Sequence, residues 1–156
     1  MRIRLISVGS RVPDWVESGY QEYARRLPRE MPLELVEIPL ARRHKNYNAL
    51  QCINQEGDAI LKVLTPRDLV VALEVKGKPW TTEKLSEHLA AWRTQGMDVA
   101  LLIGGPDGLS DACRARAVQQ WSLSPLTLPH PLVRVILAEQ IYRAWSILQG
   151  HPYHRE

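Results

Sequence analysis

The sequence predicts an α/β fold in which a mainly parallel sheet is covered by helices on both faces. Short apolar segments typical of strands alternate with longer amphipathic segments typical of helices, as in βαβ units. Several of these strands are apolar along their whole length, which indicates burial on both faces. With 156 residues, of which 45% are hydrophobic, we expect one domain over residues 1–156 with a sizeable core.

The first two thirds of the chain follow this alternation closely. Strands are expected at residues 3–8, 33–38, 69–73 and 99–103. Helices are expected at residues 14–27, where Pro28 follows, at 49–64 and at 81–96. A basic loop spans residues 41–48, and residues 76–79 are expected to form a turn. Ligands of parallel sheets bind at the carboxyl ends of the strands, which places Leu73 and Gly104 near any site.

The last third is less regular. A short helix is expected at residues 111–120, followed by an apolar segment, residues 121–128, that Pro125 interrupts. A long helix then runs from Leu132 to about Leu148 and carries a wide apolar stripe. The tail after Gly150 offers little to a core, so we expect it either to fray or to become ordered on a ligand.

Composition excludes several classes of protein. No segment has the uncharged apolar length of a membrane span, and the first residues follow a strand pattern, so we expect a cytoplasmic protein. Cys52 and Cys113 are far apart in sequence and are expected to be buried free thiols. His130, His151 and His154 have neither cysteine partners nor helical spacing, so we expect no metal site.

Basic residues are compatible with a nucleic-acid partner. The formal net charge is +3 and the isoelectric point is about 9.0. Two stretches, residues 25–26 and 42–45, could together bind phosphates, although charge alone favours a solvated loop.

A glycine-rich segment follows the strand expected at residues 99–103. Residues 104–108 read GGPDG, and glycines allow a ligand to approach the backbone closely. The segment has neither the Walker pattern nor the dinucleotide-binding spacing. A tight turn and a ligand site are equally compatible with it. Residues 123–128 similarly predict either a loop that binds an adenine through its backbone or an edge strand with a proline.

Several long motifs occur together in one order. They are PDWV at 13–16, GKPW at 77–80, LLIGGPDGLS at 101–110, WSLS at 121–124, LTLPHPLVRV at 126–135 and HPYHRE at 151–156. They resemble the bacterial ribosomal RNA large-subunit methyltransferase H family, which methylates N3 of pseudouridine 1915 in helix 69 of 23S rRNA. Only Asp107 and Pro125 depart from the expected pattern, where Glu and a small residue are usual.

The resemblance implies an α/β fold of the SPOUT type, with a C-terminal trefoil knot. It implies S-adenosylmethionine as methyl donor, and 23S rRNA within the assembled ribosome as substrate. It also implies a homodimer packed through the last helix, in which the second protomer completes the site. The implied cofactor-binding residues are Leu73, Gly104, Leu123, Ser124, Pro125, Leu126, Thr127 and Leu128.

The chemistry that the resemblance implies suggests candidate catalytic residues. The N3 of pseudouridine is an imide N–H, which must lose its proton to become a good nucleophile. His154 or His130 could accept that proton. Arg155, Arg143 or Arg134 could stabilise the imide anion, and Tyr153 could stack on the base.

Two other functions compete with methyl transfer. One is a ribosome-associated RNA-binding module without catalysis, which would use the basic loop and the aromatic tail. The other is an unrelated α/β enzyme that holds a phosphate at Gly104 and Gly105. Calorimetry with S-adenosylmethionine and with ATP separates the three, because a pure RNA-binding module would bind neither.

Overall fold

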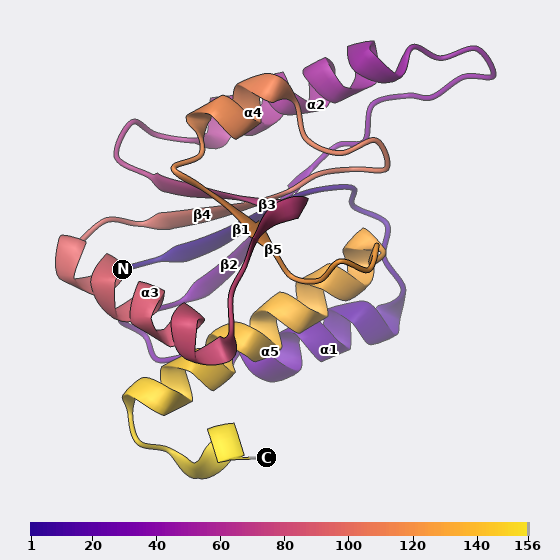
Figure 1. Cartoon of the computed structure of the whole chain (residues 1–156). Coiled ribbons are helices and arrows are strands. Elements are labelled where there is room, and N and C mark those ends of the chain that lie inside the picture. Colours follow the sequence, from indigo (N-terminus) through magenta and orange to yellow (C-terminus); the bar gives the residue numbers. More distant parts are fainter. Residues whose placement is uncertain (156) are drawn as a thin grey trace.

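A parallel sheet forms the centre of the structure, a computed structural model that describes residues 1–155 (Figure 1). Within these residues, five strands pair in the order β2-β1-β4-β3-β5, and every pairing is parallel. The strands are β1 (Ile3–Val8), β2 (Leu33–Ile38), β3 (Leu69–Pro79), β4 (Val99–Ile103) and β5 (Gln119–Ser122). The predicted α/β class is confirmed.

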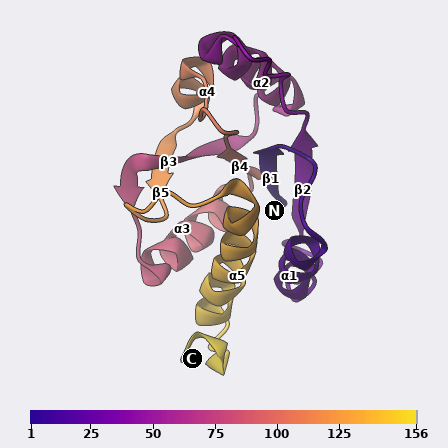
Figure 2. The same ribbon diagram turned by 90° about the vertical axis from the view of Figure 1, so that its right-hand side faces the viewer.

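Helices cover both faces of this sheet, as the sequence predicts (Figures 1 and 2). One face carries α2 (Ala49–Val63) and α4 (Asp111–Arg116), and the other carries α1 (Asp14–Ala24), α3 (Thr82–Gln95) and α5 (His130–Leu148). Successive strand residues point to opposite faces. In β4, Leu101 therefore joins the core beneath α1, α3 and α5, while Leu102 joins the core beneath α2 and α4.

Local signals explain most helix ends. The side chains of Asn48, Thr81 and Ser110 each accept a hydrogen bond from a backbone N–H at the start of α2, α3 and α4. The first helix ends at Ala24 rather than at the predicted residue 27, because residues 25–27 already turn before Pro28. The last helix begins at His130 rather than at Leu132, since Pro131 fits a first turn that needs no N–H there.

The prediction was wrong around β3 and β5. Residues 76–79 are not a turn but continue β3, and residues 119–122 form β5 rather than the end of α4. Trp121 of β5 is paired with both Leu73 and Lys78, so residues 74–77 are extra on the β3 side. A Cβ on Gly77 would lie 2.8 Å from the carbonyl carbon of Gln120, so this close pairing depends on glycine.

The tail also differs from the expectation of a frayed end. After α5, a 3-10 helix, η1 (Pro152–Arg155), folds back against α5. The ring centroids of Tyr153 and Tyr142 are 4.6 Å apart. Residues 152–155 therefore pack on their own chain, and Glu156 lies outside the described residues.

Two further expectations concern the whole chain. Cys52 and Cys113 are buried free thiols, as predicted. Among residues 1–155, no helix combines the length and the apolar character needed to cross a membrane. The trefoil knot that the resemblance implies stays a prediction.

Candidate functional site

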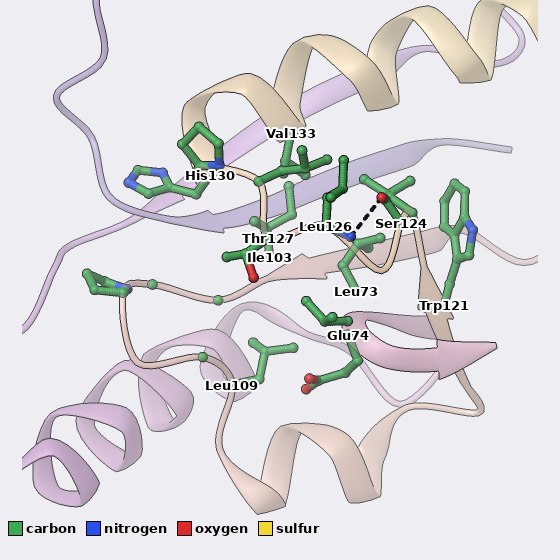
Figure 3. A pocket seen from close by; sticks show the side chains of 18 residues that line it. Leu73, Glu74, Ile103, Leu109, Trp121, Ser124, Leu126, Thr127, His130 and Val133 are labelled. Atoms are coloured by element: carbon green, nitrogen blue, oxygen red, sulfur yellow. Dashed lines mark hydrogen bonds between the residues drawn. The ribbon is translucent and has the colours of Figure 1, made fainter. Parts of the chain in front are cut away.

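A cavity of about 580 Å³ lies at the carboxyl edge of the sheet (Figure 3). Three parts of the chain line it: the middle of β3 at residues 73–75, residues 103–109 without Asp107, and residues between Trp121 and Val133, Pro125 excepted. The predicted positions Leu73 and Gly104 thus lie in one pocket, as the strand-end argument requires. Its size is typical of sites for small molecules.

The walls of the pocket are mostly apolar. Leu73, Ile103, Leu109 and Val133 present aliphatic side chains to it. The carboxylate of Glu74 also lines the pocket, and it accepts a hydrogen bond of 3.3 Å from Nη1 of Arg114. Such a pocket suits a flat apolar ring together with a polar group near Glu74.

Hydrogen bonds of Ser122 and Ser124 hold the segment 123–128. The hydroxyl of Ser124 accepts a hydrogen bond from the Leu126 N–H at 2.9 Å (Figure 3). The hydroxyl of Ser122 donates to the Ser124 carbonyl at 3.2 Å. Of the predicted cofactor-binding residues in this segment, all but Pro125 line the pocket. Leu126 is 71% exposed and therefore lies at the mouth.

Gly104 is required by its own loop. A Cβ at this position would lie 2.6 Å from the carbonyl carbon of Gly108 and 2.8 Å from the Leu109 nitrogen. The loop closes through a hydrogen bond of 3.0 Å from the Gly108 N–H to the Gly105 carbonyl. The residue lines the pocket as expected, but the contact that excludes a side chain is made within residues 104–109.

His130 belongs to the pocket only in part. It lines the cavity, yet Figure 3 shows its imidazole pointing away from the centre. A Cβ on Gly9, at the end of β1, would lie 2.9 Å from Cε1 of this ring. Burial, and then the positive charge of Arg134, lower the pKa of His130 below its ordinary value. The ring is therefore neutral at physiological pH.

The candidate catalytic residues Arg143, Tyr153, His154 and Arg155 lie toward the opposite end of α5. Tyr153 donates its hydroxyl proton to Glu139 at 3.1 Å, and the Arg143 guanidinium lies 4.8 Å from the Tyr153 ring centroid. Burial and the Glu139 carboxylate raise the pKa of Tyr153 above its ordinary value, so its hydroxyl stays protonated. His154 is partly buried in η1, and Arg155 is exposed.

One chain does not bring these two groups together. The 19 residues of α5 span roughly 28 Å, with His130 at one end and η1 beyond the other (Figure 1). Of the predicted catalytic residues, only His130 is part of the pocket of its own chain.

Arg134, the other candidate for anion stabilisation, has a structural place. Its side chain is 1% exposed. It donates to the Gly9 carbonyl at 2.6 Å, to Ser7 Oγ at 3.3 Å and to Glu37 Oε2 at 3.1 Å. These bonds tie α5 to β1 and β2, so Arg134 cannot face a substrate base.

The basic residues do not form one surface. Arg26 lies against Tyr23, Tyr142 and Tyr153 near the tail, with its guanidinium carbon 5.4, 5.4 and 5.9 Å from their ring centroids. Arg43 instead bonds Glu56 and Asp107 at the carboxyl edge of the sheet. The contacts of Arg26 and Arg43 therefore do not favour a joint phosphate-binding surface of residues 25–26 and 42–45 within one chain.

Several pocket residues were missed by sequence reasoning. They include Glu74, Ile103, Leu109, Trp121 and Val133. Glu74 carried a signal, since it directly follows Leu73 at the end of an apolar stretch. Trp121 belongs to the motif WSLS, but its place in the pocket could not be predicted, because that place depends on the unforeseen pairing of β5 with β3. Among the described residues, no three His, Cys, Asp or Glu side chains gather as metal ligands would.

Comparison with known proteins assigns this architecture to a family. A family model described as "Predicted SPOUT methyltransferase" matches residues 1–154. A protein of Hahella chejuensis named Ribosomal RNA large subunit methyltransferase H is 67% identical over 156 residues, and the match covers all of both chains. Proteins of the same name from Ectopseudomonas mendocina and Pseudomonas putida strain W619 are each 59% identical over 155 residues, which is 99% of this chain and all of theirs.

These matches confirm the resemblance carried by the sequence motifs, and the parallel sheet agrees with the SPOUT fold that the resemblance implies. The chain belongs to the SPOUT methyltransferase family, within the group of the ribosomal RNA large subunit methyltransferases H.

Proposed function

We propose that this protein transfers a methyl group from S-adenosylmethionine to N3 of pseudouridine 1915 in 23S rRNA, acting as a homodimer on the assembled ribosome. The single observation that carries the proposal is the apolar cavity at the carboxyl edge of the sheet. It is lined by the loops in which the family resemblance expects the cofactor. Relatives with 59–67% identity bear names that state ribosomal RNA methylation.

The residues of the pocket fit the proposed cofactor. Leu73, Ile103 and Leu109 can enclose an adenine ring, and the backbone of residues 123–128 can hydrogen-bond its edge. The Glu74 carboxylate can accept hydrogen bonds from sugar hydroxyls or attract a cationic group. When bound, S-adenosylmethionine supplies an activated methyl group on a sulfonium.

A homodimer would complete the site. The pocket and the tail lie at opposite ends of α5, so an antiparallel partner could bring its tail over the pocket of the first chain. Along α5, six apolar side chains stay partly exposed in one chain, namely Leu132, Val135, Ile136, Trp145, Ile147 and Leu148. Burial of these side chains against a second copy would stabilise such a dimer.

The protonation, charge and orientation of each candidate side chain suggest its catalytic role. Tyr153 keeps its proton and therefore serves by stacking on the base or by donating a hydrogen bond, not as the proton acceptor. Arg155 and Arg143 supply positive charge for the imide anion. His154 of the tail is the preferred proton acceptor, because the imidazole of His130 points away from the pocket centre.

Methylation assays with three substrates test the proposal. Whole ribosomes, separated large subunits and naked rRNA are incubated with isotopically labelled S-adenosylmethionine, and the modified nucleotide is located by mass spectrometry. We expect label at N3 of pseudouridine 1915, with whole ribosomes as the best substrate. Label at another nucleotide would disprove the site, and equal labelling of naked rRNA would disprove the requirement for the assembled ribosome.

A further inference from the structure

Arg43 is the one residue of the basic stretch 42–45 that turns inward. Its side chain is 14% exposed, whereas Arg42, His44 and Lys45 are exposed. Its Nη1 and Nη2 donate to the two carboxylate oxygens of Glu56 at 2.8 and 3.3 Å. Its Nε donates to Asp107 at 3.0 Å. One guanidinium thus joins two carboxylates from distant parts of the chain.

Glu56 anchors this arrangement beneath the glycine-rich loop. Its side chain is 2% exposed, and it also accepts a hydrogen bond of 3.0 Å from the Ala41 N–H. A Cβ on Gly105 would lie 3.2 Å from Glu56 Oε1, so the loop rests directly against this carboxylate. Without Arg43, Glu56 would be a buried charge with no cationic partner, which is strongly unfavourable.

Asp107 connects Arg43 to the pocket without entering it. Gly104, Gly105, Pro106 and Gly108 all line the cavity, while Asp107, in the same loop, does not. Its side chain is turned to Arg43 and is 23% exposed. The carboxylate can therefore act on a ligand only through the shape of the loop.

We propose that Arg43 is a positioning residue, which through Asp107 and Glu56 holds loop 104–108 in the shape that admits the cofactor. The inference rests on the proposed binding of S-adenosylmethionine in this pocket. Only arginine suits the position, because a lysine ammonium has no planar fork with which to reach both carboxylates at once.

Hydrogen exchange in the ligand-free protein gives the first test. If the ion pairs hold the loop, Arg43→Met and Asp107→Ala should each speed exchange of the amides of residues 104–109 (Pro106 has none) by about tenfold more than exchange in strands β1 and β4. Unchanged exchange in these amides would overturn the inference, whatever the pocket binds.

A double-mutant cycle on cofactor affinity gives the second test. Calorimetry with S-adenosylmethionine should show about tenfold weaker binding for each single variant. The double variant should bind no more weakly than Arg43→Met alone, because that change already removes the contact between Arg43 and Asp107. Asp107→Glu, which keeps a carboxylate, should restore most of the affinity. Losses that multiply in the double variant would mean that Asp107 contacts the cofactor directly and would overturn the inference.

Two control variants separate positioning from general effects. Arg42→Met removes the same charge from the exposed neighbour and should leave affinity unchanged. Arg116→Met removes a guanidinium that donates to the carbonyls of Thr65 and Asp68, and it should lower the melting temperature without weakening binding. If Arg116→Met weakened binding as much as Arg43→Met, the role of Arg43 would be merely structural. Failure of the parent protein itself to bind would instead refute the proposed function.

Discussion

At position 104, a single methyl group would collide with the loop to which the residue belongs. We expect Gly104→Ala to weaken S-adenosylmethionine binding by more than tenfold, because the Cβ contact of 2.6 Å with Gly108 forces residues 104–109 to move. It should also lower the melting temperature. Calorimetry and a thermal melt on the same sample measure both effects.

Gly96→Ala is the matched control for this change. Gly96 ends α3 with a positive φ of 66°, and a Cβ there would have nothing within 4 Å. It should cost about 1 kcal/mol of folding free energy through backbone strain alone. Cofactor affinity should stay at the parental value. Equal loss of affinity in the two variants would contradict the proposed role of the loop at Gly104.

His130 makes stability depend on pH. Its pKa is lowered in the folded state, so the unfolded chain binds more protons as pH falls, and folding stability decreases below the unfolded pKa of about 6.5. Above that pH the contribution is fully present. The pKa of His88 is also lowered by burial, so two histidines share the effect.

Urea unfolding at pH 7.5 and pH 5.5 measures this dependence. The free energy of unfolding should drop between the two values in the parent protein. In His130→Asn the drop should be smaller but still present, because His88 remains. If the free energy of unfolding dropped equally in the parent and in His130→Asn, His130 would not contribute to the pH dependence.

Single residues were predictable where one strand end determined their place. Leu73 and Gly104 could be placed near a site because both follow apolar strands of a parallel sheet. Arg134 could not be distinguished from a catalytic arginine, since its partners Ser7, Gly9 and Glu37 lie about a hundred residues away in sequence. The inward turn of Arg43 was also hidden, because its partners Glu56 and Asp107 lie 13 and 64 residues away and no local pattern links them to it.

At the scale of elements, Tyr153 holds η1 against α5. Truncation after Gly150 removes the Tyr153 ring from Tyr142 and its hydroxyl from Glu139. The loss of about 1 kcal/mol should lower the melting temperature by roughly 2–4 °C. Cofactor affinity should fall modestly, and methyl transfer to ribosomes by orders of magnitude.

Tyr153→Phe refines this experiment. It keeps the ring but removes the hydroxyl, so the melting temperature should stay between those of the parent and the truncated protein. Its pH–rate profile should match the parental one, because the hydroxyl never loses its proton in the working range. Full single-turnover activity of the truncated protein would show that His154 is not the proton acceptor and would leave His130 or solvent in that role.

Helices and strands were predicted well where local residues mark their ends. They were predicted poorly where pairing with a distant strand determines whether they form. The ends of α2 and α3 follow from Asn48, Thr81 and Gly96. The extension of β3 and the existence of β5 follow from pairing between residues more than forty positions apart, such as Lys78 with Trp121. Such long-range pairing leaves no periodic trace in a four-residue strand.

For the whole molecule, a mixing experiment tests whether two chains share a site. Leu73→Lys places a positive charge in the pocket, where it should repel the sulfonium, and truncation after Gly150 removes the tail. Each variant alone should be inactive. After subunit exchange, the mixture should regain about a quarter of parental activity, because half of the dimers are mixed and each holds one complete site.

The same mixture excludes a site within one chain. If pocket and tail of the same chain worked together, no combination of the two variants would hold an intact pair, and activity would stay at zero. Sedimentation of the parent should in parallel give twice the chain mass of 17.8 kDa. A monomer with full activity would refute the homodimer.

The length of α5 makes activity depend on how much of the protein a cell contains. If catalysis needs the two ends of this helix from different chains, an isolated copy is inert however well it folds. When the protein concentration is below the dissociation constant of the dimer, the dimeric fraction is proportional to the protein concentration. Total activity is then proportional to the square of that concentration. At low expression, the rate of methylation would then fall faster than the number of copies of the protein.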